Sequence, residues 1–247
     1  SAASDVYKRQ TSKIEEQNNP SIQLTLSDKD FDYLDSNKKE FVKTVLPIII
    51  NENQNILMIR SFVNELKGKL ETFRTLNNNE IRKLNDIAKK YNIKYQNKHK
   101  LDLVDEILSN VDVIPNSIVL AQAAIESGWG KSRFAKEYNA LFGEYTYDDS
   151  EGVIPLEREN GDTHLIKAFS SYGNSVESYF DNINSHYAYE DFRDIRNIMR
   201  KRNNFSNVNL LVNKLSTYAE DENYIKTIRQ VIKTNNFGIF DQKTISY

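Results

Sequence analysis

Apolar residues recur three and four positions apart over long stretches of this chain, which is the spacing of one buried face on an α-helix. The first stretch begins at Lys38 and reaches Leu66, with Pro47 inside it. Because proline lacks a backbone donor and clashes with the preceding turn, we expect Pro47 to kink this helix or to start a new one. Further helices are predicted for Ile81–Tyr91, Leu101–Leu108, Pro115–Glu126, Ser132–Tyr138, Ser175–His186, Phe192–Arg200, Val208–Leu215 and Asp221–Lys233.

One segment between these helices has a different pattern. Residues 144–167 are rich in Tyr, Asp, Gly and Thr, and the segment ends in THLIKAF (Thr163–Phe169), which alternates like a strand. We interpret Val153–Phe169 as a β-hairpin that turns at Asn160–Gly161, because an Asn-Gly pair suits a tight hairpin turn. The pattern therefore predicts a mainly α fold with a small β-hairpin lobe and an N-terminal helical extension.

Composition and charge narrow the possible functions. The 247 residues are 39% apolar and 11% aromatic, enough for one large domain or a domain with an extension. The formal net charge is −2 with mixed signs, so no basic face for nucleic acid is expected. The chain has no cysteine, and its three scattered histidines (His99, His164 and His186) predict no metal site and no cofactor. No apolar run approaches the ~18 residues of a membrane span. We expect a monomer without a transmembrane segment.

Residues 1–37 are predicted to be a lead-in, polar and aperiodic from residue 11 to residue 35. Within it, Asp5–Gln10 (DVYKRQ) can be encoded by GATGTGTATAAGAGACAG, which resembles a transposon-derived sequencing adaptor. We expect Ser1–Gln10 to be an assembly artefact that replaces the true N-terminus and its signal peptide.

The most informative carboxylate is Glu126, in AQAAIESGWG (Ala121–Gly130). It follows Pro115–Ile125, eleven residues without a charge. Poor hydration and the negative end of the helix dipole both raise the pKa of such a carboxyl group. A carboxylic acid still protonated near neutral pH suits a general acid. The alternative is a structural glutamate at a helix end that Gly128 terminates.

Several segments carry a resemblance to a known family. IESGWG followed by NALFG (Asn139–Gly143) resembles the signature of the lysozyme-like N-acetylglucosaminidases of glycoside hydrolase family 73. Four further segments resemble the Bax-like branch of that family, in the same order, so that the likeness covers roughly residues 38–235. They are Phe41–Arg60, Leu141–Tyr147, Thr163–Phe169 and Asn174–Arg196. A last segment, Leu215–Ile232, resembles the YATDPNY motif of the family.

The resemblance implies a lysozyme-like α+β fold in which Glu126 protonates the glycosidic oxygen. The domain boundaries that we expect are a helical extension at 38–110, a glucosaminidase domain at 111–240 and a tail at 241–247. The family's second carboxylate lies in the β-lobe, and Glu157 in LERENG occupies that place, with Glu159 and Glu144 as alternatives. Each of these carboxylates can equally be a solvated charge of the lobe.

Further site residues follow from the same resemblance. Tyr218 matches the family's cleft-facing tyrosine, which is implicated in catalysis, and the alternative is a buried structural anchor. Where the family has threonine and aspartate, this chain has Glu220 and Asp221, and Tyr224 is interpreted as core. Substrate contacts are expected from one group of residues near Glu126, each of which has core packing or turn formation as its alternative: Ser127, Trp129, Phe142, Gly143, Tyr145 and Tyr147.

The function implied is a peptidoglycan hydrolase of the cell envelope or periplasm that cleaves GlcNAc-β-1,4-MurNAc bonds, with peptidoglycan glycan strands as its partner. Two alternatives stay open. A lytic transglycosylase on the same fold would leave a 1,6-anhydro sugar. A non-catalytic glycan-binding envelope protein would bind strands without forming any product.

Overall fold

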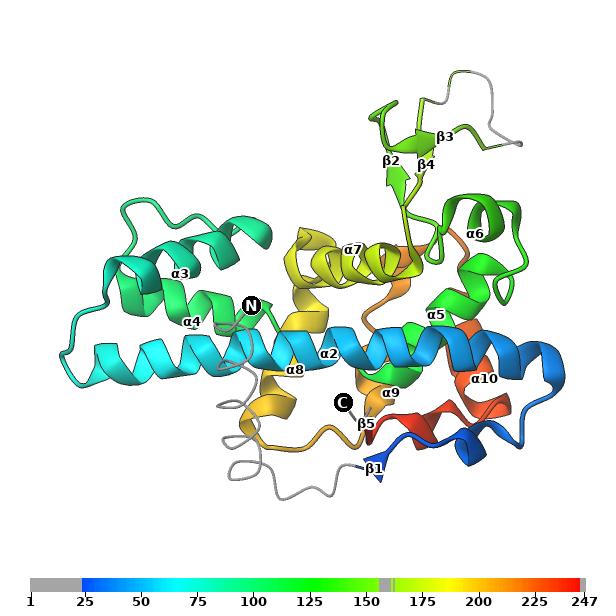
Figure 1. The fold of residues 1–247 in the computed structure, drawn as a ribbon, viewed down its shortest axis with the longest axis horizontal. Helices are drawn as coiled ribbons and strands as arrows, with labels where there is room; N and C mark the ends of the chain where they lie inside the picture. Colours follow the sequence, from blue (N-terminus) through cyan, green and yellow to red (C-terminus); the bar gives the residue numbers. More distant parts are fainter. Residues whose placement is uncertain (1–23, 156–160, 162, 245–247) are drawn as a thin grey trace.

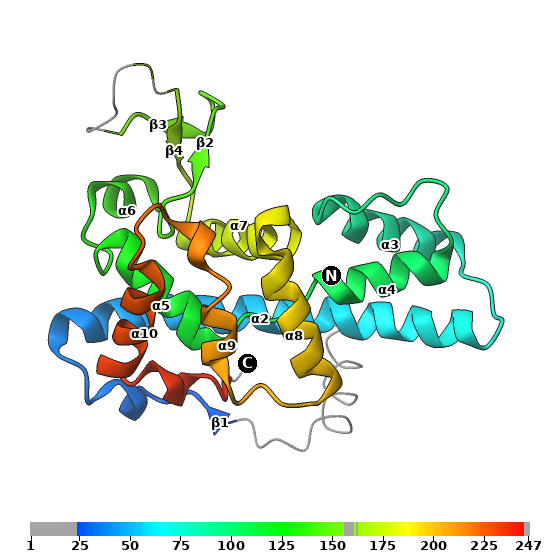
Figure 2. The same cartoon turned by 180° about the vertical axis from the view of Figure 1, so that it is seen from behind.

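The structure is a computed structural model that describes residues 24–155, 161 and 163–244. Most of these residues are helical, and the predicted mainly α fold with a small β-lobe is confirmed. In Figure 1 a long helix, α2, crosses the molecule, with α3 and α4 beside one end of it. Helix α7 lies next to α2, and the small sheet projects on the side of α7 that faces away from α2. Figure 2 shows the reverse side, where α8, α9 and α10 lie across α2.

Helix α2 covers Ser36–Glu71 and forms the backbone of the fold. Asp35 caps its start by accepting a hydrogen bond from the Lys38 backbone N–H. The helix continues through Pro47, so the expectation that Pro47 starts a new helix is wrong. Leu46, directly before the proline, is fully buried, and this packing offsets the one intrahelical hydrogen bond that proline removes.

Two shorter helices pack at the far end of α2. Helix α3 covers Asn78–Lys90, and α4 covers Lys100–Asn110, which contacts α2 over much of its length. The last residue of α3, Lys90, also pairs with Glu177 at 2.5 Å and Asp181 at 3.4 Å. Both carboxylates belong to α7, so α3 is tied to the middle of the molecule.

Helix α5, Asn116–Ser127, lies at the centre because nearly every residue on it is apolar or small. It contacts α2 on one side and α10 on another. The helix ends at Gly128, whose left-handed φ of 56° is a conformation that glycine adopts without a steric penalty. Helix α6, Arg133–Tyr138, follows this turn, with Ser132 as its cap.

The β-lobe is a three-stranded antiparallel sheet in the order β2-β4-β3. Its strands are β2 at Tyr145–Thr146, β3 at Gly152–Val153 and β4 at Leu165–Lys167. Strands β3 and β4 form the predicted hairpin, and β2 is an additional strand that the sequence pattern did not reveal. Of the predicted turn, Asn160 lies outside the described residues.

The remaining helices follow the predicted order with shifted ends. Helix α9 is shorter than expected and α10 starts later. They are α7 at Tyr172–Ser185, η2 at Tyr187–Tyr189, α8 at Glu190–Lys201, α9 at Val208–Val212, η3 at Ser216–Tyr218, α10 at Tyr224–Thr234 and η4 at Phe237–Phe240.

The structure also contains short elements in the two segments for which the sequence predicted a lead-in and a tail. Residues 28–31 form the short helix η1 (Asp28–Phe31), and Phe31 joins the core. Strand β1 (Leu24–Thr25) pairs in parallel with β5 (Lys243–Thr244). Asp241 accepts hydrogen bonds from the backbone N–H and hydroxyl of Ser117, at 2.7 and 2.8 Å, and so caps the start of α5. The division into extension, domain and tail stays a prediction.

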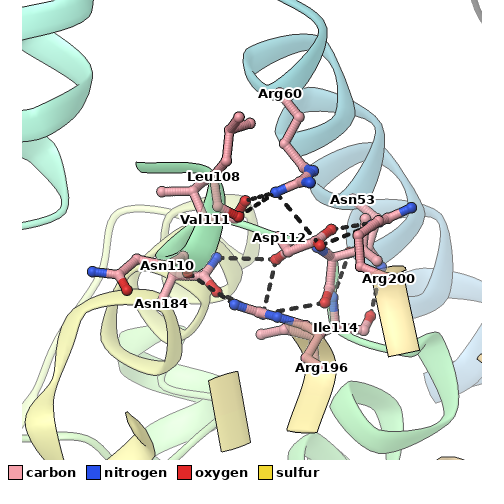
Figure 3. Close-up of polar contacts among 11 residues, drawn as sticks. Asn53, Arg60, Leu108, Asn110, Val111, Asp112, Ile114, Asn184, Arg196 and Arg200 are labelled. Carbon is pink, nitrogen blue, oxygen red and sulfur yellow. Dashed lines mark hydrogen bonds and ion pairs between the residues drawn. The ribbon is translucent and has the colours of Figure 1, made fainter. Parts of the chain in front are cut away.

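A buried ionic network joins three parts of the fold, as Figure 3 shows. Asp112, fully buried between α4 and α5, binds the guanidinium of Arg200 through both carboxylate oxygens, at 2.5 and 2.9 Å. Arg60 of α2 reaches the same carboxylate at 3.5 Å and donates to the carbonyl of Val111. Arg196 of α8 donates to the Asp112 carbonyl at 3.0 Å. The network therefore joins α2 and α8 to the segment that leads into α5.

Candidate functional site

A cleft of about 720 Å³ opens beside the C-terminal end of α5. Its walls come from α5, the loop after α6, the β-lobe, α7, η3 and the end of α3. Five of the candidate site residues named in the sequence analysis line it: Glu126, Gly143, Glu144, Tyr145 and Tyr218. The cleft therefore gathers residues that are up to 92 positions apart in sequence.

Glu126 lies in the last turn of α5 and is half-buried. Burial raises the pKa of its carboxyl group, because the charged form loses hydration, and this agrees in direction with the sequence argument. A hydrogen bond from the Tyr224 hydroxyl partly offsets the shift by stabilising the ionised form. Glu126 thus has the environment that a general acid requires.

Gly143 lies directly against this carboxyl group. Its φ is +63°, and a Cβ built on it would lie 2.8 Å from Oε2 of Glu126. The preceding residues fix the loop, since Leu141 and Phe142 are buried and the Leu141 N–H donates to the Ser175 hydroxyl at 3.1 Å. Glycine is therefore required here both by the backbone conformation and by the space that Glu126 occupies.

Tyr218, on η3, is anchored by its hydroxyl. The hydroxyl donates to the Phe142 carbonyl at 2.8 Å, and the ring stacks parallel to that of Tyr224 with centroids 5.8 Å apart. Burial, together with nearby acidic groups such as Glu144, holds the pKa of Tyr218 well above its usual value. Tyr218 therefore faces the cleft as a neutral hydroxyl whose oxygen keeps lone pairs to accept a further hydrogen bond.

Glu144 is a second carboxylate in the cleft. The Ser178 hydroxyl donates to its Oε2 at 2.6 Å, while Oε1 is buried and has no hydrogen-bond partner among the described residues. Burial raises its pKa, and the Ser178 hydrogen bond and the charge of Lys167 lower it in part. Of the three second-carboxylate candidates, Glu157 and Glu159 lie outside the described residues.

Two expected contact residues next to Glu126 lie away from the cleft. The Ser127 hydroxyl donates to the Ala123 carbonyl at 2.6 Å and accepts from the Gly130 N–H at 2.9 Å, so it holds the turn. Trp129 packs its ring against Phe41 at 5.7 Å and Phe237 at 6.0 Å. Their predicted contact with substrate gains no support from this placement.

The aromatic residues after the LFG turn divide between core and surface. Phe142 is buried and stacks on Tyr179 at 4.3 Å. Tyr145 is 65% exposed and lines the cleft, whereas Tyr147 is 77% exposed and lies outside it. Of these three residues, only Tyr145 is an exposed ring in the cleft, and it lies with its centroid 4.6 Å from that of His164.

The sequence interpretation missed the role of Tyr224, which was assigned to the core. It is indeed buried, yet its hydroxyl is hydrogen-bonded both to Gln122 and to Glu126. The available signal was Gln122 itself, a polar residue in an apolar helix, four positions before Glu126 and therefore on the same face.

No metal cluster is found in the part of the chain that the structure describes: no three histidine, aspartate or glutamate side chains are grouped so that they could hold an ion. The residues that line the cleft offer carboxyl groups, hydroxyl groups, two lysine side chains and the exposed aromatic ring of Tyr145.

Comparison with known sequences identifies the family. A family model described as mannosyl-glycoprotein endo-beta-N-acetylglucosaminidase, the glucosaminidase family, matches residues 101–237. The chain belongs to the glucosaminidase family. The resemblance to family 73 enzymes is thereby confirmed, and membership places the chain among glycoside hydrolases.

Individual relatives agree with this placement. The chain is 33% identical to Protein bax of Escherichia coli strain K12 over 184 residues, which are 74% of this chain and 63% of the relative. The chain thus spans less than two thirds of that protein. It is also 33% identical over 93 residues to the peptidoglycan hydrolase FlgJ of the same strain, 32% of this chain and 29% of FlgJ.

The solved structures that match include the catalytic domain of the autolysin Auto from Listeria monocytogenes. It has a TM-score of 0.40 and 19% sequence identity, and the match covers 73% of this chain and 86% of that domain.

Proposed function

We propose that this chain hydrolyses the GlcNAc-β-1,4-MurNAc bonds of peptidoglycan, with Glu126 as the general acid. The observation that carries the proposal is the position of Glu126, half-buried in a cleft and with a raised pKa. Membership of the glucosaminidase family and similarity to a protein named peptidoglycan hydrolase support the substrate class.

In this proposal Glu126 donates its proton to the glycosidic oxygen as the bond to the leaving sugar breaks. The raised pKa keeps a larger share of the carboxyl group protonated near neutral pH than in an exposed glutamate. Donation leaves a carboxylate, which the Tyr224 hydroxyl stabilises through its hydrogen bond. The site thus accommodates both protonation states.

Tyr218 is proposed to orient the N-acetyl group of the substrate. Its own proton is used in the hydrogen bond to the Phe142 carbonyl, so its oxygen is left to accept the N–H of an acetamido group. This contact would place the acetamido oxygen for attack on the anomeric carbon, or would simply hold the sugar in register.

The group that activates water is proposed to be Glu157, at the place of the family's second carboxylate. Glu144 is the alternative within the described residues, since it lies in the same cleft as Glu126. The stereochemical outcome depends on the distance between the two carboxyl groups. Where the substrate's own acetamido group assists, neither carboxylate needs to act as a nucleophile.

We place this activity in the cell envelope, where peptidoglycan is found. In the described part of the chain, no helix is long and apolar enough to cross a membrane. The glycan strands of peptidoglycan are the proposed partner.

The test is digestion of purified peptidoglycan with wild-type protein and with Glu126→Gln, followed by mass spectrometry of the soluble products. Wild type should release fragments with reducing GlcNAc ends, and Glu126→Gln should release almost none while keeping its fold. Glu65→Gln, which removes an exposed carboxylate on α2, is the matched control and should cleave like wild type. Anhydro-MurNAc ends would indicate a lytic transglycosylase instead, and strand binding without products would indicate a non-catalytic glycan-binding protein.

A further inference from the structure

A chain of three buried polar side chains leads from the core to the candidate acid. The Tyr179 hydroxyl, on α7, donates to Oε1 of Gln122, and Nε2 of Gln122 donates to the Tyr224 hydroxyl at 3.2 Å. The Tyr224 hydroxyl in turn is hydrogen-bonded to the Glu126 carboxyl group. The chain thus links α7, α5 and α10 before it ends on Glu126.

The direction of these hydrogen bonds is fixed by the donors available. Gln122 and Tyr179 are fully buried and Tyr224 is 4% exposed. Because the amide oxygen of Gln122 accepts from Tyr179, its NH₂ group is the side that faces Tyr224. Since that NH₂ group occupies a lone pair of the Tyr224 oxygen, the Tyr224 proton is directed to Glu126. Every donor in the chain therefore points toward the acid.

We propose that the Tyr179–Gln122–Tyr224 chain is a positioning device, which holds the Glu126 carboxyl group in place and sets the pH range over which it acts as an acid. Tyr224 holds the carboxyl group from α10, and Gly143, which has no Cβ, leaves room for its Oε2. The inference rests on the proposed role of Glu126 as general acid. Tyr224 is a positioning residue because it acts through Glu126.

Other titratable groups also line the cleft around Glu126: acidic, basic and tyrosine side chains. Replacement of Tyr224 alone leaves all of them in place. They are Lys90, Glu144, Tyr145, Lys167, Asp181, Tyr189, Tyr218 and Glu220.

The decisive variant is Tyr224→Phe, which removes one hydroxyl and keeps the ring that stacks on Tyr218. Without this donor the ionised carboxylate is less stable, so the pKa of Glu126 should rise. The alkaline limb of the kcat/KM profile on soluble peptidoglycan glycan strands should move to higher pH by about one unit. The maximal rate should fall at the same time, because the carboxyl group is held less firmly.

The matched control is Tyr91→Phe, which removes another buried hydroxyl, one that has no hydrogen-bond partner among the described residues. Its pH profile should coincide with that of wild type. Gln122→Leu should move the alkaline limb in the same direction as Tyr224→Phe but by less, since Tyr224 stays present but loses its directing donor.

The outcomes separate this inference from the proposed function. If wild type cleaves, Glu126→Gln is inactive and the Tyr224→Phe profile has the wild-type limb, the positioning device is refuted while the function stands. A lower rate with an unmoved limb refutes it equally, since that shows a merely structural role. If wild type forms no products, the proposed function itself has failed.

Discussion

Replacement of Gly143 by alanine tests the geometry around the candidate acid. A non-glycine residue in the left-handed conformation of Gly143 costs about 1–2 kcal/mol. The new Cβ would also lie 2.8 Å from Oε2 of Glu126, about 0.6 Å short of the 3.4 Å at which ordinary contact begins. The carboxyl group is the mobile end of a flexible side chain, so we expect it to move aside rather than unfold the loop.

The expected result is a loss of activity larger than the loss of stability. A displacement of about 1 Å at a reacting group costs on the order of a hundredfold in rate, so Gly143→Ala should lose about ten- to a hundredfold in kcat/KM. Its free energy of unfolding in urea should fall by only about 1–2 kcal/mol.

Gly128→Ala is the matched control for this prediction. Gly128 has a similar φ of +56°, yet a Cβ there meets nothing closer than the Ser132 backbone nitrogen at 4.0 Å. It should lose a similar amount of stability and retain most of its activity. Equal activities of the two variants would refute the close approach of Gly143 to Glu126.

Two further predictions concern stability and substrate contact. Asp112→Asn removes the only carboxylate in the described buried network and leaves Arg60 and Arg200 without the group that they pair with. We expect a loss of about 3–5 kcal/mol and a Tm lower by about 10 °C in a thermal melt, and an unchanged Tm would contradict this account of the network. Tyr145→Ala should raise KM for glycan strands about tenfold with little change in Tm, because an exposed ring in the cleft is lost. Tyr147→Ala, which removes an exposed ring outside the cleft, should change KM much less. Equal effects of the two variants on KM would argue against a contact between Tyr145 and the substrate.

Much of the fold follows from the period of apolar residues. The helical spacing places α2 through α5 correctly, because each buries one continuous face against the core. The alternative that Pro47 starts a new helix was wrong, because burial of Leu46 and its neighbours outweighs the hydrogen bond that proline removes. Strand β2 was missed because two residues are too few to show an alternating pattern.

The candidate site was predicted in part. An apolar helix that ends in a single carboxylate indicates a perturbed acid, and the structure agrees with the direction of that perturbation at Glu126. The contact of Gly143 with its Oε2 depends on how two distant loops pack, which no local pattern contains. The role of Tyr224 was missed for a similar reason, since a buried tyrosine looks like core until its hydroxyl partners are known.

The most direct test of the whole account is the product analysis of peptidoglycan digested by wild type and by Glu126→Gln. The account predicts reducing GlcNAc ends from wild type and almost no products from the variant, with both proteins showing the same circular dichroism spectrum. Wild-type levels of product from Glu126→Gln would contradict the assignment of Glu126 as the general acid.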